Sequence, residues 1–356
     1  MKAIVYHTLG VMALVTLCQP SVEAQAKEYI RVGGRVLAIE SGTTQGNGSA
    51  TVLGVSPPGG LALTQTFAFT FSSPSGYQSL TVVDVLINNS LNGGSACYFA
   101  VVPSGANFSV LLINDAGDAG GPYASMTLPG SGTVQNSQCS IAGSGSSVSG
   151  SGNNLIVTLA ITFKTSFSGV SGQAITSNKI MYLSAQNAAG NSGWQAAGTW
   201  NVPGAVCQGP PCVVSVAPSH GTTTGGSYAF QFSDANGFAD LTVLNVLVNS
   251  VLDGQQACFL AFVPSGASGG TVNLVNDAGN AGGPYAVMTL PGTASVQNGH
   301  CAISGVGSSV SGSGTSMTLT LNITFTNFSG NRVMYLAARN SGVSSGWQAV
   351  GSVAVP

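Results

Sequence analysis

Hydrophobic and polar residues alternate along much of the chain with the two-residue period of a β-strand. Residues 317–325 read MTLTLNITF, and residues 155–163 read LIVTLAITF, with large apolar residues at every odd position. Such alternation predicts strands that have one buried face and one exposed face. Clusters of Gly, Ser, Asn and Pro separate these stretches at short intervals, as in sandwiches and barrels. The pattern therefore predicts an all-β fold.

The chain contains two copies of one module. The segment GGPYASMTLPG at 120–130 recurs as GGPYAVMTLPG at 282–292, and most other features recur at a similar offset. We predict one β-sandwich at 51–203 and a second at 213–356, and these ranges are called copy one and copy two below. Each is long enough to bury a core of its own. The repeat therefore predicts two tandem β-sandwich domains.

The cysteines follow the repeat. Two of them occupy matching positions in each copy, which predicts one disulfide within each copy. Closing a loop of about 40 residues contributes roughly 4 kcal/mol in the chain-entropy model. Two further cysteines flank a pair of prolines in 204–212, which we predict to be a disulfide-closed linker. The predicted pairs are Cys97–Cys139, Cys258–Cys301 and Cys207–Cys212.

Residues 1–26 have the pattern of a cleaved secretory signal peptide. An apolar run ends at Cys18, and small residues allow cleavage after Ala24 or Ala26. The run is about half the ~20 residues that a membrane span needs, so we expect no membrane span in the mature chain. Cys18 raises a lipoprotein alternative, but Leu17 stands where a lipidation signal has a small residue. We expect a secreted, periplasmic or cell-surface protein.

Charged residues are scarce. Only 5% of the 356 residues are Asp, Glu, Lys or Arg, against about 25% in ordinary domains. The net charge is −2, and no Lys or Arg lies between Arg35 and Lys164 or between Lys179 and Arg332. This distribution excludes a basic face for nucleic acid or for an anionic membrane.

The last hairpin of each copy carries a family resemblance. In copy two it reads VMYLAARN at 333–340 and GWQAVG at 346–351, and copy one repeats both segments. The hairpin resembles the closing strand pair of bacterial extracellular immunoglobulin-like or fibronectin-III-like repeat modules. The resemblance implies two tandem immunoglobulin-like β-sandwiches. Trp194 and Trp347 follow the second cysteine of their copy, whereas antibody domains place the tryptophan between the two cysteines.

A short element precedes the two copies. The sequence KEYIRVGGRVLAIE at 27–40 is similar to a stretch of bacterial YD-repeat (Rhs-type) proteins. One such stretch cannot close the shell that many YD repeats build. For 27–50 we therefore expect a short strand or hairpin followed by a Gly/Ser/Thr linker.

No combination of residues typical of a catalytic site occurs at matching positions in both copies. The mature chain has His220 and His300 only, and neither has a histidine counterpart in copy one. Asp84 aligns with Asn245, and Asp234, Asp240 and Asp253 likewise align with uncharged residues of copy one. We therefore expect a non-enzymatic protein. A secreted hydrolase is the less favoured alternative, because acidic residues from separate loops would have to converge.

Two kinds of binding residue stand out. The loops NDAGDAGG and NDAGNAGG supply oxygens that suit calcium, although Asn, Asp and Gly also form ordinary turns. The candidate calcium ligands are Asp115, Asp118, Asp277 and Asn280, and no other cofactor is expected. Trp194, Trp347, Tyr123 and Tyr285 occupy equivalent places in the two copies. If exposed they would stack on sugar rings, and if buried they would anchor the core.

These observations predict an exported structural, adhesive or binding protein. The neutral Ser/Thr/Asn/Gly surface suits hydrogen bonding to an extracellular protein or glycan. Self-assembly through unpaired sheet edges is a further option. A carbohydrate-binding accessory protein is the main alternative, and exposure of the tryptophan rings in a groove would favour it.

Overall fold

The structure is a computed structural model that describes residues 27–32, 35–41, 48–169, 177–204, 209 and 211–356. Strands dominate these residues, and their helical elements are three short 3-10 turns. The all-β class expected from the alternating pattern is confirmed, and its immunoglobulin type stays a prediction. None of the helical elements in these ranges has the length and apolar character needed to cross a bilayer.

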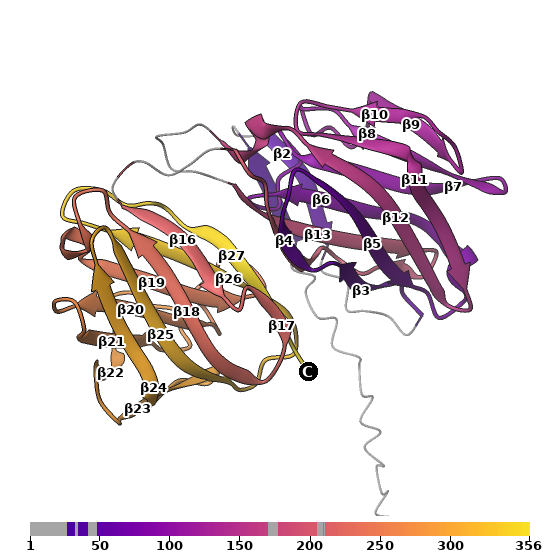
Figure 1. The fold of residues 1–356 in the computed structure, drawn as a ribbon. Helices are drawn as coiled ribbons and strands as arrows, with labels where there is room; N and C mark the ends of the chain where they lie inside the picture. The colour runs from indigo at the N-terminus through magenta and orange to yellow at the C-terminus, as the bar shows by residue number, and fades with distance from the viewer. Residues whose placement is uncertain (1–26, 33–34, 42–47, 170–176, 205–208, 210) are drawn as a thin grey trace, which may run out of the picture.

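A separate hairpin precedes copy one. Its strands are β1 (Lys27–Val32) and β2 (Arg35–Ser41), and they pair antiparallel with an irregularity between Ile30 and Arg31. The remaining strands form two pairs of sheets, one pair in each copy (Figure 1).

Copy one contains a smaller sheet and a larger sheet. Its strands are β3 (Thr51–Ser56), β4 (Gly59–Leu61), β5 (Thr64–Ser72), β6 (Leu80–Asn88), β7 (Cys97–Ser104), β8 (Asn107–Ile113), β9 (Tyr123–Leu128), β10 (Thr133–Gln135), β11 (Cys139–Ser151), β12 (Asn154–Phe163), β13 (Asn178–Asn187), β14 (Gly190–Asn191) and β15 (Gln195–Asn201). The smaller sheet has the order β10-β11-β12-β5-β3. The larger has the order β4-β15-β13-β6-β7-β8-β9, with β14 paired to β13.

Copy two repeats this arrangement. Its strands are β16 (Cys212–Ala217), β17 (His220–Thr222), β18 (Gly225–Ser233), β19 (Val243–Asn249), β20 (Cys258–Pro264), β21 (Gly270–Val275), β22 (Tyr285–Leu290), β23 (Ser295–Gln297), β24 (Cys301–Ser313), β25 (Ser316–Phe325), β26 (Gly330–Arg339) and β27 (Gln348–Val355). The sheet orders are β16-β18-β25-β24-β23 and β17-β27-β26-β19-β20-β21-β22. Short parallel strands, β4 on β15 and β17 on β27, occupy equivalent sheet edges.

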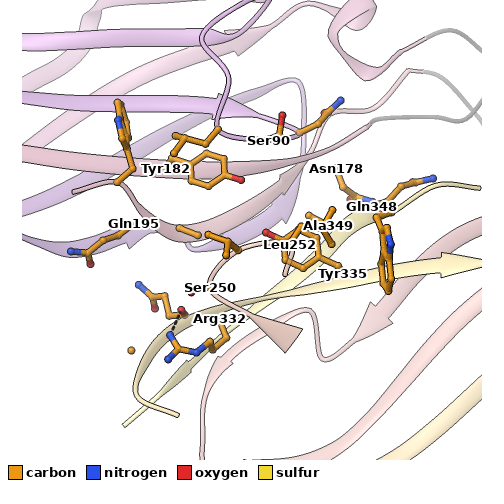
Figure 2. A pocket seen from close by; sticks show the side chains of 18 of the residues that line it. Ser90, Asn178, Tyr182, Gln195, Ser250, Leu252, Arg332, Tyr335, Gln348 and Ala349 are labelled. Atoms are coloured by element: carbon orange, nitrogen blue, oxygen red, sulfur yellow. Dashed lines mark hydrogen bonds between the residues drawn. The ribbon is translucent and has the colours of Figure 1, made fainter. Parts of the chain in front are cut away.

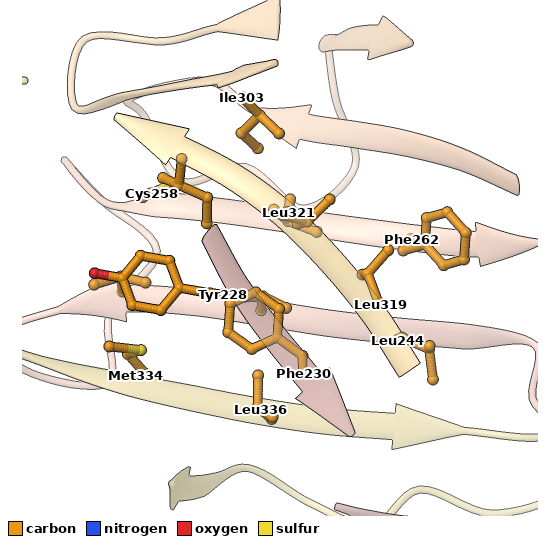
Figure 3. Close-up of a cluster of buried hydrophobic side chains, with 14 of the residues drawn as sticks. Tyr228, Phe230, Leu244, Cys258, Phe262, Ile303, Leu319, Leu321, Met334 and Leu336 are labelled. Atoms are coloured by element: carbon orange, nitrogen blue, oxygen red, sulfur yellow. The ribbon is translucent and has the colours of Figure 1, made fainter. Parts of the chain in front are cut away.

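Each core lies between the two sheets of its copy. In copy two the buried face of β25 packs Leu319 and Leu321 against residues of the facing sheet, including Phe262 and Leu336 (Figure 3). The intervening threonines and asparagine of β25 are not fully buried. The alternation read from the sequence therefore corresponds to the inward and outward faces of the strand.

One disulfide links the two sheets in each copy. Cys97 on β7 is bonded to Cys139 on β11, and Cys258 on β20 is bonded to Cys301 on β24. Both predicted pairings are confirmed, and all four cysteines are fully buried. Cys212 is also disulfide-bonded, and its predicted partner Cys207 lies outside the described residues.

Replacing Cys258 and Cys301 together by Ala should lower the free energy of unfolding by about 4 kcal/mol. The bond closes a loop with a sequence separation of 43 residues, and its loss enlarges the unfolded ensemble. Urea unfolding of the oxidised protein, followed by tryptophan fluorescence, measures the change. The double replacement of Cys97 and Cys139 by Ala is the matched comparison and should lower the free energy of unfolding by a similar amount. A variant as stable as the parent would contradict this role.

Candidate functional site

The outer faces of the two large sheets pack against each other. A third buried cluster joins Leu86, Ile180 and Ala196 of copy one to their counterparts Leu247, Val333 and Ala349 of copy two. In the two copies β13 corresponds to β26, and β15 corresponds to β27. β15 contacts β27, and β15 also contacts β26 just as β27 contacts β13. The copies therefore meet through equivalent surfaces, in the manner of a two-fold symmetric dimer.

A groove of about 630 Å³ opens along this contact. Figure 2 shows side chains from both copies around it, with Tyr182 and Gln195 on one side and Tyr335 and Gln348 on the other. Its lining includes eight matching pairs of residues: Asn89 and Ser250, Ser90 and Val251, Leu91 and Leu252, Asn178 and Asn331, Tyr182 and Tyr335, Trp194 and Trp347, Gln195 and Gln348, and Ala196 and Ala349. Aromatic rings and planar amides dominate the lining.

A tyrosine pair lies at the centre of the contact. The Tyr182 and Tyr335 hydroxyls interact with each other, and both side chains are buried. Burial raises the pKa of both phenols, that of Tyr335 to about 12, while the interaction with Tyr182 lowers the pKa of Tyr335. Both phenols are therefore neutral at physiological pH.

The predicted binding tryptophans both line this groove. Trp194 packs edge-on against Tyr98 and Trp347 packs edge-on against Phe259, each with ring centroids 5.8 Å apart. Trp347 is 36% exposed, and Trp194 is half-buried beside the inter-copy cluster. By contrast the third tryptophan, Trp200, is buried in the core of copy one. The two groove rings are thus neither core anchors nor freely projecting side chains.

A second groove, of about 520 Å³, lies on the outer face of the large sheet of copy two. Trp347 lines both grooves, so the two cavities adjoin at its ring. Tyr285 lines the second groove, and its ring is held by a hydrogen bond from its hydroxyl to the Ala281 carbonyl. The other lining residues include Asn245, Asn273, Ser344, Arg339 and Phe259. Tyr123 of copy one makes the equivalent bond to Ala119.

In the predicted calcium loops, the side-chain oxygens accept hydrogen bonds from nearby protein groups. Asp115 accepts hydrogen bonds from the backbone and the hydroxyl of Ser137, and Asp277 accepts the backbone N–H of Gly299. Asp118 and Asn280 each accept the backbone N–H two residues later, Gly120 at 2.8 Å and Gly282 at 2.9 Å. Within the described ranges, no three His, Cys, Asp or Glu side chains are grouped to hold a metal ion. The loops behave as turns tied to their neighbours.

One acidic residue was missed as a site feature. Asp84 on β6 lies opposite Ser184 on β13 and near Tyr98 on the outer face of copy one. Burial raises the pKa of its carboxyl to about 7, and burial together with the Asp84 charge raises the pKa of Tyr98. Copy two has Asn245 at this position, which is a signal in the sequence that the two outer faces differ.

Asp84→Asn should stabilise the protein at pH 8 by on the order of 2 kcal/mol. The folded-state pKa of about 7 exceeds the ordinary value of 3.8, so folding favours the protonated carboxyl. The free energy of unfolding therefore falls as pH rises through this window. Denaturant unfolding at pH 8 and pH 3.5 tests this, and the gain should vanish at pH 3.5. The reciprocal variant Asn245→Asp should lose stability at pH 8, and equal effects at both pH values would contradict the assignment.

Comparison of the chain with protein-family models and with curated proteins finds no match.

Proposed function

We propose that the protein is an exported, non-enzymatic binding protein whose inter-copy groove is a saccharide site. The observation that carries the proposal is the presence of the two partly exposed tryptophans, Trp194 and Trp347, in one groove. Aromatic rings offer flat apolar faces that stack on the C–H faces of sugar rings, and each of these residues also has a polar end. A partly exposed tryptophan in a groove is what separates this function from a purely structural one.

The polar lining supports the same ligand class. Gln195, Gln348, Asn178 and Asn331 present amides that both donate and accept hydrogen bonds. Sugar hydroxyls have the same dual character, so amides placed beside aromatic rings match them in both respects. A concave site with aromatic walls and a few polar groups is the usual form of a small-molecule site.

Trp347→Ala should lower saccharide affinity at least tenfold, because the ring lines both grooves. A glycan array and pull-down on insoluble polysaccharides identify the ligand, and titration calorimetry then measures the affinity. Trp347→Phe keeps an aromatic face and should retain part of the binding.

Val306→Ala removes an exposed apolar side chain on β24, away from the groove, and is the control for non-specific loss. Unchanged binding by Trp347→Ala, with a circular dichroism spectrum like that of the parent, would contradict the groove as the site. If the protein bound none of the saccharides tested, this result would contradict the proposed function itself.

An adhesive role through self-assembly is a second candidate. β3 and β16 are equivalent edge strands of the two smaller sheets, and they expose Leu53 (54%) and Val214 (45%) at matching positions. An apolar edge strand can pair with another chain. Light scattering across a range of protein concentrations tests this, and a monomer at every concentration would argue against it.

A further inference from the structure

The two arginines of copy two lie in the two grooves that meet at Trp347. Arg332 lines the inter-copy groove and Arg339 lines the groove on the outer face of copy two. They are the only Lys or Arg residues after Lys179 in a chain with eight Lys and Arg in all. Among the described residues that line the two grooves there is no Asp or Glu. Each groove therefore has one arginine and no acidic residue among its described lining residues.

Arg332 is held in place with hydrogen-bonding capacity to spare. Its guanidinium lies 4.7 Å from the centroid of the Phe328 ring, and Nη1 donates to the Asn331 carbonyl at 2.9 Å. Its Nε is buried and has no hydrogen-bond partner among the described residues. A guanidinium has five N–H donors in a planar fork that fits a carboxylate. Stacking on Phe328 orients the guanidinium, and because Nε is buried, the two terminal nitrogens carry the N–H donors that remain for a carboxylate.

Copy one does not reproduce this charge pattern. Lys179 replaces Arg332, but it is buried, lies 4.1 Å from the Phe167 ring centroid and donates to Asn89 at 2.6 Å. Gln186 replaces Arg339, and Asp84 replaces Asn245. The outer face of copy one therefore carries an acidic group where copy two is neutral. The positive character belongs to copy two and to the groove that both copies share.

We propose that the two adjoining grooves bind an acidic oligosaccharide, with one carboxylate at Arg332, a second at Arg339 and a sugar ring on Trp347. The inference rests on the proposed saccharide function and names its ligand class. The net charge of −2 conceals this local feature, because the acidic residues of the chain lie outside the two linings. Charge pairing here is short-ranged and sets specificity, while the rings and amides bind the uncharged part of each sugar.

The test uses the full mature chain and a panel of uronate oligosaccharides of several linkages. Each oligosaccharide is paired with its carboxyl-reduced counterpart, which keeps the hydroxyl pattern and removes the charge. Calorimetry should show at least one uronate bound about tenfold more tightly than its reduced partner. Raising the salt concentration should reduce that preference.

Arg339→Gln should lower the preference for the uronate severalfold and leave the affinity for the reduced sugar unchanged. Arg332→Gln should do the same, and Arg332→Lys controls for loss of packing on Phe328 because it keeps a cation there. Lys164→Gln removes one positive charge from copy one, outside both grooves, and should change nothing.

The outcomes separate the two proposals. Equal binding of uronates and reduced sugars, or a preference that survives both arginine variants, overturns the acidic ligand and leaves the saccharide site intact. No binding of any saccharide, acidic or reduced, overturns both. Binding that Trp347→Ala leaves unchanged places the ligand elsewhere and also overturns the inference.

Discussion

The face-to-face contact between the two large sheets is the constraint on which the candidate site depends. Each copy has its own core and its own disulfide, but neither copy alone forms the inter-copy groove. Ile180, Tyr182 and their counterparts lie on the side of β13 and β26 that faces away from the core. They are buried only because the other copy covers them. Since the chain joins the copies, this contact forms at a high effective concentration.

The same contact explains why the last hairpin of each copy is apolar on both faces. One face of β13 contributes Met181 and Leu183 to the core of copy one, and the other contributes Ile180 and Tyr182 to the inter-copy cluster. A strand that faced solvent on one side would show alternation. Trp194 and Trp347, which immediately precede β15 and β27, lie at the rim of this contact. They remain reachable because the covered area ends there.

The sequence predicted the fold class and the two intra-copy disulfides, because alternation and cysteine position are local signals that the repeat shows twice. It also identified Trp194 and Trp347 as candidates, but left open whether they were buried. The groove itself was not foreseen, since it forms between residues about 150 positions apart. The apolar run at 180–183 was an available signal, because a strand without alternation needs two covered faces. Asp84 was considered only as an acidic residue without a counterpart in copy two, although it lies on a strand beside Tyr98.

The near two-fold relation of the copies also bears on how a chain-like ligand would be oriented. A polysaccharide has a reducing end and a non-reducing end, whereas a symmetric groove offers the same contacts in both directions. Orientation must then come from the positions at which the duplicates have diverged. Arg332 opposite Lys179, and Ser250 opposite Asn89, are such positions within or beside the groove. The small differences between two similar halves would thus give the site its polarity.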